Sequence, residues 1–218
     1  MTDLVAQARA IESMYVEYRR RGPSGMKQLM LAFQQTYETA DQFRIYEHNV
    51  IPGLFQTADY IRAMLTFWMR FLNTKNDIDE AIAARLERQA ILYEGRRKYT
   101  VVLEENALRT WFGTAETMVG QLDRLLSLMS LPNVALGIVP AMIERQGVGS
   151  AGFWIFDDKL VTLETPTASI EITPAAGDPS LRPHVRVALP VRGLWAGGPR
   201  SDHPSANRDE RQQLSATT

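Results

Sequence analysis

Apolar residues recur every three or four positions through much of the first two-thirds of the chain, and this spacing predicts helices. We expect long helices over residues 2–21, 24–37, 58–72, 77–93 and 115–129, with one or two helical turns over 105–111. Thr57 is a predicted N-cap. Asp77 followed by Glu80 has the spacing of a capping box. In the last long helix we expect five residues to face inward, namely Met118, Leu122, Leu125, Leu126 and Met129.

Shorter segments alternate apolar and polar residues, which is typical of strands. These segments are 43–47, 99–103, 134–139, 152–156, 160–164 and 169–173. Asp157-Asp158-Lys159 is a candidate hairpin turn between two of them. The order of elements predicts an α+β fold, with a helical N-terminal two-thirds followed by a small antiparallel sheet.

The pattern also divides the chain. We predict a helical connector over 1–40, the main domain over 41–174 and an irregular tail over 175–218. Pro, Gly and polar residues are frequent in that tail and its helical periodicity is lost, so we expect disorder there.

Composition narrows the function classes. The net charge is -1, from 24 Lys and Arg against 25 Asp and Glu, which disfavours non-specific nucleic-acid binding. The chain contains no cysteine, which excludes disulfides and thiolate chemistry, and it has only three histidines. We therefore expect no metal and no cofactor. Neither a signal peptide nor a membrane span is evident, so we expect a cytoplasmic protein.

Several residue groups could carry chemistry, but each has a simpler interpretation. Glu104-Glu105 would be a strand end and a helix start. Glu47-His48 has the residue types of an acid–base pair, although a lone His in a loop is usually polar surface. Asp157-Asp158 suits turn chemistry better than cation binding. Arg85 and Arg88 share a helix face that could grip an anion or could be a solvated surface balanced by glutamates. Trp68, Trp111 and Trp154 could line a pocket, although such residues are more often core.

No phosphate-binding glycine pattern or nucleophile elbow is present, so residue patterns alone stop at an α+β domain with no catalytic set. One further signal lies in ordered blocks of the chain, which are Phe43–Glu47, Ile51–Thr57, Asp59–Ala63, Arg85–Gln89, Val102–Arg109, Gln121–Leu125 and Leu131–Val134. Together these blocks resemble domain of unknown function 5753 over about residues 8 to 173.

The resemblance implies a context. That domain follows a helix-turn-helix of the lambda-repressor-like (XRE) type in many actinobacterial transcriptional regulators, and it is thought to sense a ligand or a partner protein. If the family shares a pocket, the residues that match its motifs are the candidate ligand contacts: Glu47, Gln56, Thr57, Tyr60, Arg85, Arg88, Gln89 and Arg109. The resemblance supplies no catalytic residue.

The ends of the chain depart from the family pattern. No helix-turn-helix precedes the domain in this sequence, so we expect no direct DNA binding from this chain alone. After about Thr173 the family continues with a helix resembling Tyr-Ala-Arg-Met-Phe, whereas this chain reads Leu181-Arg182-Pro183-His184-Val185. A one-base shift of permitted codons reproduces the family motif, so an out-of-frame tail is one hypothesis and a divergent natural tail is the other.

Three functional hypotheses follow. In the first, the chain is the sensor domain of an XRE-type regulator and lacks the DNA-binding domain. It would respond to a small-molecule effector or a small protein partner, and a homodimer is one assembly that we consider. Alternatively, it is a stand-alone small-molecule-binding protein or enzyme of a biosynthetic cluster. The third hypothesis is a protein-interaction module or a gene relic.

Overall fold

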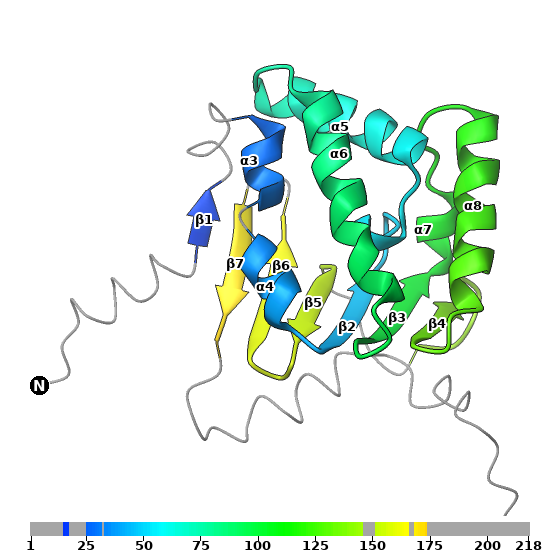
Figure 1. The fold of residues 1–218 in the computed structure, drawn as a ribbon. Coiled ribbons are helices and arrows are strands. Elements are labelled where there is room, and N and C mark those ends of the chain that lie inside the picture. The colour runs from blue at the N-terminus through cyan, green and yellow to red at the C-terminus, as the bar shows by residue number, and fades with distance from the viewer. Residues whose placement is uncertain (1–14, 18–24, 32, 146–150, 166–167, 174–218) are drawn as a thin grey trace, which may run out of the picture.

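A mixed β-sheet carries the fold in the computed structural model, which describes residues 15–17, 25–31, 33–145, 151–165 and 168–173 (Figure 1). Seven described strands form the sheet in the order β1-β7-β6-β5-β2-β3-β4. They are β1 Tyr15–Glu17, β2 Gln42–Glu47, β3 Lys98–Glu104, β4 Val134–Val139, β5 Phe153–Phe156, β6 Leu160–Glu164 and β7 Ala168–Ile172. The α+β class and the six predicted strands are thus confirmed.

The prediction of an antiparallel sheet is wrong for two of the six pairings between described strands. β2, β3 and β4 run parallel to one another, whereas β5, β6 and β7 are antiparallel to their neighbours. The reason is that helices follow β2 and β3, and each crossover carries the chain from the carboxyl end of one strand back to the opposite end of the sheet, where the next strand begins. Two of these parallel strands, β2 and β3, lie within the mostly helical first two-thirds of the chain, where strands were predicted over 43–47 and 99–103.

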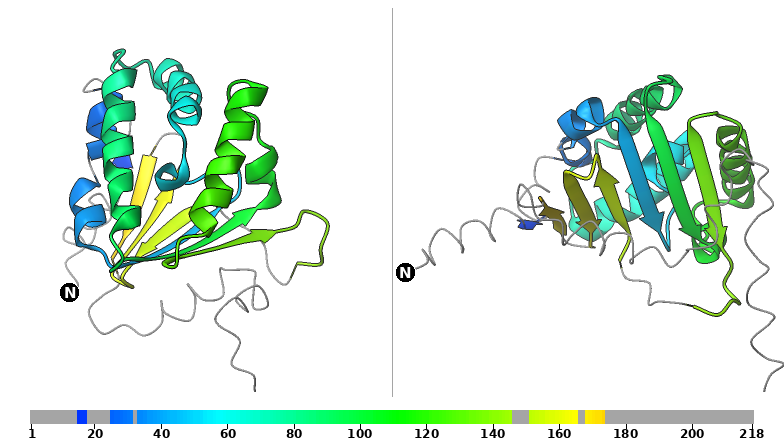
Figure 2. Two further views of the ribbon diagram at one scale, coloured as in Figure 1. Left: turned by 45° about the vertical axis from the view of Figure 1, so that its right-hand side comes forward. Right: turned by 90° about the horizontal axis from the view of Figure 1, so that it is seen from below.

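The helices of the described residues are α3 Met26–Leu31, α4 Gln34–Thr39, α5 Ala58–Leu72, α6 Ile78–Arg88, α7 Glu105–Arg109 and α8 Ala115–Met129, with 3-10 turns η2 Gly53–Phe55 and η3 Gln89–Tyr93. Helices α3 to α6 and α8 lie on one face of the sheet (Figure 2). Within the described part of the chain, no helix is both long and apolar enough to cross a membrane.

Two predicted helices differ in the structure. The helix expected over 24–37 is two short helices, α3 and α4. Of the helix expected over 2–21, only Tyr15–Glu17 lies within the described residues, and it is the strand β1, paired with β7. Tyr and Val are favoured in strands, and the edge of β7 offers backbone hydrogen-bonding groups that local helical spacing cannot reveal. The tail over 175–218 lies outside the described residues, and the division at residue 40 stays a prediction.

The core follows from the period of two along each strand. Phe43 and Ile45 of β2 point toward the helices and join the main core with Tyr99, Val101 and Trp154. Tyr46 points to the opposite face, where a second cluster contains Val102, Val139, Phe153 and Ile155.

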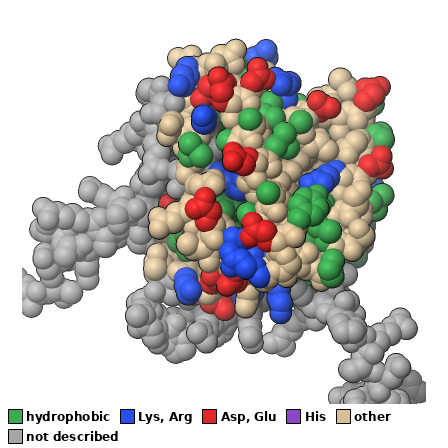
Figure 3. Space-filling model, in the orientation of Figure 1, with side chains coloured by type: hydrophobic (Ala, Val, Ile, Leu, Met, Phe, Trp, Pro, Cys, Tyr) green, Lys and Arg blue, Asp and Glu red, His purple; other side chains and the backbone are tan. Residues whose placement is uncertain are grey.

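Helix α8 buries a different stripe from the one predicted. Met118, Gln121, Leu125 and Leu128 are buried against the sheet. The expectation was wrong for Leu122, Leu126 and Met129, which are exposed together with Val119. Apolar residues occupy two stripes of this helix, and only packing against the sheet edge decides which one is buried. On the face of the molecule that carries the helices, acidic and basic side chains are interspersed with small clusters of hydrophobic side chains (Figure 3).

Asp77 caps a different helix from the predicted one. Its side chain makes no capping bond to α6, where the sequence spacing had placed it. Its carboxylate oxygens instead accept hydrogen bonds from the backbone N–H groups of Met26 (2.8 Å) and Lys27 (3.1 Å) at the start of α3. Gly25 has φ +95°, and a Cβ at this position would collide with the Asp77 carboxylate. Asp77 therefore joins α3 to α6.

We expect Asp77→Ala to lower the free energy of unfolding by about 2 kcal/mol, because two backbone donors of α3 lose a charged acceptor. Urea unfolding at neutral pH measures the difference. Asp79→Ala is the matched control, since Asp79 is exposed and pairs with Arg62 at the surface; the loss of stability in this variant should stay below about 0.5 kcal/mol. Equal losses in the two variants would contradict the bridging role of Asp77.

Candidate functional site

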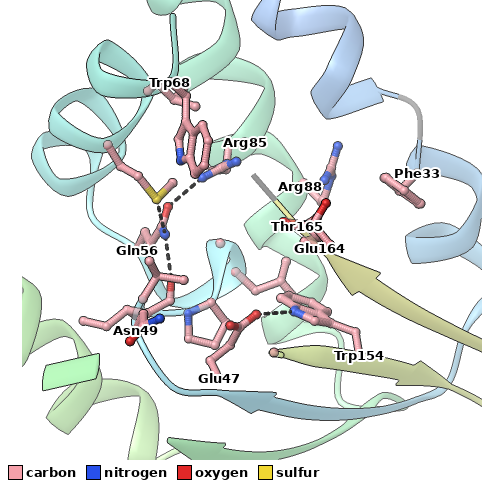
Figure 4. A pocket seen from close by; sticks show the side chains of 18 of the residues that line it. Phe33, Glu47, Asn49, Gln56, Trp68, Arg85, Arg88, Trp154, Glu164 and Thr165 are labelled. Carbon is pink, nitrogen blue, oxygen red and sulfur yellow. Dashed lines mark hydrogen bonds between the residues drawn. The ribbon is translucent and has the colours of Figure 1, made fainter. Parts of the chain in front are cut away.

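A cavity of about 440 Å³ lies between the helices and the carboxyl end of β2 (Figure 4). Its floor comes from the ends of β2, β5 and β6, and its walls come from the segment 48–56, from α5 and α6, and from Phe33 and Tyr37. Cavities of this size accommodate small organic ligands. Carboxyl ends of parallel strands are also the usual place for ligands in sheets with helical crossovers.

Strand register builds the floor of this pocket. Ile45 pairs with Trp154, and Trp154 in turn pairs with Thr162. Two residues further along, the same register brings Glu47, Gly152 and Glu164 into one row across β2, β5 and β6. A Cβ at Gly152 would collide with Glu47 Oε2, so only glycine fits between the two carboxyl side chains.

Glu47 is an acid of the site with a strongly raised pKa. It follows Phe43 and Ile45 on the helical face of β2, so it points into the pocket. Its Oε1 accepts a hydrogen bond from Trp154 Nε1 at 2.9 Å. Burial raises the pKa of Glu47 to about 8; the Trp154 bond opposes this rise and the charge of Glu164 adds to it. At neutral pH the protonated acid is therefore the main form when no ligand is bound.

Other side chains of the protein already contact the two arginines of the pocket. Arg85 Nη1 donates to Gln56 Oε1 at 2.7 Å, and the Arg88 guanidinium lies 4.5 Å from the centre of the Tyr37 ring. Burial lowers the pKa of Arg85 to about 10, and the charge of Glu164 opposes this change. Glu164 stays in contact with solvent, but desolvation still raises its pKa, while Arg85 and Arg88 act to lower it.

Buried amide side chains hold the loop that closes the pocket. Gln121 is fully buried; its Nε2 donates to Phe55 O (2.8 Å) and its Oε1 accepts from Thr57 N (2.7 Å). Gln89 Nε2 donates to Gly53 O (3.0 Å) and Gln56 O (2.8 Å).

Two further hydrogen bonds fix the loop, one within it and one to α5. Gln56 Nε2 donates to Ile51 O (2.6 Å), and Ile51 N donates to Tyr60 OH (3.3 Å). The segment 51–57 is thus fixed by α5, α6 and α8 although it contains only one short 3-10 turn.

The structure brings together half of the candidate ligand contacts. Glu47, Gln56, Arg85 and Arg88 line the cavity. The other four do not line it. Thr57 caps α5 by accepting a hydrogen bond from Tyr60 N at 3.3 Å, which confirms the predicted N-cap. Tyr60 and Gln89 are buried behind the loop, and Arg109 is exposed and paired with Glu105.

Sequence reasoning missed four pocket residues as ligand contacts: Tyr37, Trp68, Trp154 and Glu164. The two tryptophans were noticed as aromatic residues suited to a pocket, but their spacing equally fits core. For Glu164 the only signal was its place at the end of an alternating segment. Its position beside Gly152 depends on strand order, which no local pattern contains.

The other candidate groups have structural roles. Glu104 ends β3 and Glu105 begins α7, as predicted, but Glu104 is buried, accepts a hydrogen bond from Tyr46 OH (2.9 Å) and pairs with Arg145 (2.7 Å). Asp157 and Asp158 both have positive φ, which confirms the hairpin turn. Within the described ranges, no three His, Cys, Asp or Glu side chains are grouped to hold a metal ion.

These observations describe a domain with a well-formed pocket, and the comparison with known families agrees with the sequence blocks. The family model "Domain of unknown function (DUF5753)" matches residues 32–177. The chain belongs to this family. The matched region of this DUF5753 domain contains β2 to β7 and α4 to α8, and with them most of the pocket. No curated protein matches the chain.

We expect Gln121→Leu to lower the free energy of unfolding by about 3 kcal/mol, because it leaves Phe55 O and Thr57 N buried without partners. Chemical unfolding measures this loss. Gln35→Leu on the exposed side of α4 is the matched control and should change stability by less than about 0.5 kcal/mol. A loss of similar size in the control would mean that the amide bonds to the loop are unimportant.

Stability should depend on pH through Glu47. Its folded pKa of about 8 lies above the value of about 4.5 for an ordinary glutamate, so between these values the folded state binds more protons than the unfolded state. Stability contributed by this group therefore falls as pH rises through that window. We expect Glu47→Gln to gain stability relative to wild type from pH 5 to pH 8.5, by at most about 1.4 kcal/mol per pH unit.

Unfolding curves at several pH values test this dependence, with Glu87→Gln as the control because Glu87 is exposed on α6. The control should give a flat difference from wild type. A flat difference for Glu47→Gln as well would show that Glu47 titrates normally.

Proposed function

We propose that this DUF5753 domain binds a small organic ligand in the pocket and acts as the ligand-sensing part of an XRE-type transcriptional regulator. The observation that carries the proposal is the cavity of about 440 Å³, in which apolar walls surround a few ionisable groups. That combination is typical of ligand sites, in which apolar contacts supply affinity and a few polar groups fix orientation.

The way the pocket is built supports binding. Its lining comes from elements far apart in the chain, including α4, the segment 48–56, α6 and the ends of β5 and β6. A ligand would contact all of them at once and would therefore add stability to the folded state. Linkage of this kind is what a sensor domain needs, because occupancy then changes the equilibrium between conformations.

The regulatory context is supported by the family blocks rather than by the pocket. Residues that match the family motifs form both the cavity wall and the network behind it, for example Gln56 in the wall and Gln89 behind it. A ligand sensed here would act on whatever the domain is joined to or associates with.

A fluorescence-based thermal unfolding screen with a chemically diverse compound library tests the proposal. A compound present at 100 times its Kd stabilises the folded state by about 2.7 kcal/mol. Ala151 lines the pocket, so Ala151→Trp should fill it and abolish the stabilisation. Ala83→Trp places the same side chain on the exposed face of α6 and should keep it.

Two results would contradict ligand binding in this pocket. One is that no compound stabilises the wild-type protein. The other is that Ala151→Trp, still folded by circular dichroism, responds to the active compounds as strongly as Ala83→Trp does.

A further inference from the structure

The pocket floor has the chemistry of a cation site. We propose that it binds the protonated amino group of a small apolar ligand, with the carboxylate of Glu47 as the ion partner, which presupposes the ligand site proposed above. Because Gly152 has no side chain, the Glu47 carboxylate lies directly over its backbone, and Glu47 also lines the cavity. An ammonium group in the cavity can approach this carboxylate and carries the opposite charge.

Glu47 lacks the partner that a buried carboxylate needs. Among the described residues, no Lys, Arg or His forms an ion pair with it. Trp154 Nε1 donates a hydrogen bond to it, and no basic side chain contributes to the shift of its pKa. A buried carboxylate without a cation is costly, and a ligand cation would remove that cost.

The two arginines of the pocket favour an anionic ligand less than Glu47 favours a cationic one. Arg85 already donates to Gln56, Arg88 lies over Tyr37, and both act on Glu164. Their positive charge is therefore partly met by the protein. Figure 4 shows them on the other side of the pocket from Glu47 and Trp154.

The rest of the cavity suits an apolar, preferably aromatic, body. Met64, Leu65 and Trp68 of α5 line one wall, and Trp154 stands beside Glu47. An ammonium group beside an indole ring also gains cation–π attraction. The class of ligand is thus an aryl-alkyl amine.

Binding of such a ligand should depend on pH, because the Glu47 carboxyl must lose its proton to pair with the amine. Titratable or charged groups on the pocket side near Glu47 are Glu164 of β6, Tyr60 of α5, His48, and Arg85 and Arg88, which act on Glu164. The adjacent Tyr46 lies on the opposite face of the sheet. Glu47 is the group with a pKa of about 8 among them. Affinity for an ammonium probe should therefore rise about tenfold per pH unit from pH 6 to pH 8.

The experiment uses probes that share a body and differ in the head group. Calorimetry compares tryptamine, its alcohol analogue tryptophol and the carboxylate indole-3-propionate, with the phenyl analogues of each as a second series. At pH 8.5 we expect the ammonium probe to bind at least about tenfold more tightly than the alcohol in one series or both. Glu47→Gln should remove that preference and its pH dependence, whereas Glu87→Gln should leave both unchanged.

Tightest binding of the carboxylate or the alcohol in both series, or no binding of either ammonium probe at 10 mM, would overturn the amine assignment. An ammonium preference that survives in Glu47→Gln would also overturn it. These failures are distinguishable from failure of the proposed function. If library compounds stabilise the wild-type protein but not Ala151→Trp, the pocket binds a ligand of another chemistry.

Discussion

The polar backbone of the segment 51–57 is the constraint on which this structure most depends. The segment runs between the sheet and three helices, where water cannot satisfy its N–H and C=O groups. Gln56, Gln89, Gln121 and the Tyr60 hydroxyl supply those hydrogen bonds from three helices and from the loop itself. Each amide ties the loop to a different element, so the helices that cover β2 are placed by the same bonds that shape the pocket wall.

The charges of the pocket follow from the same arrangement. Burying a carboxyl group is unfavourable unless it is neutral or paired. Glu104 is paired with Arg145 on the opposite side of the sheet and shows the ordinary solution to this problem. Glu47 has a single indole donor and so retains its proton to higher pH. The difference between two glutamates at the ends of neighbouring parallel strands identifies the one that is suited to a ligand.

Local patterns predicted the elements well. The strand at 134–139, the helix at 115–129 and the N-cap at Thr57 agree with the structure, because side-chain periodicity and capping act within a few residues. Patterns failed where a choice depended on a distant partner. Asp77 has the right spacing to cap its own helix, but the unsatisfied N–H groups of Met26 and Lys27 lie closer to its carboxylate. Leu126 has the right spacing for the core, but the sheet covers another stripe of α8.

The sequence by itself determined the α+β class, most elements, the family and four of the residues that line the pocket, since those properties reside in short-range order and in motif residues such as Gln56 and Arg85. Only the tertiary structure decided that β2, β3 and β4 are parallel and that β5 lies between β2 and β6. That strand order brings residues 47, 152 and 164 into one row. The physical reason is that strand pairing is selected by long-range backbone hydrogen bonding and by burial of the whole sheet, neither of which is encoded in any one segment.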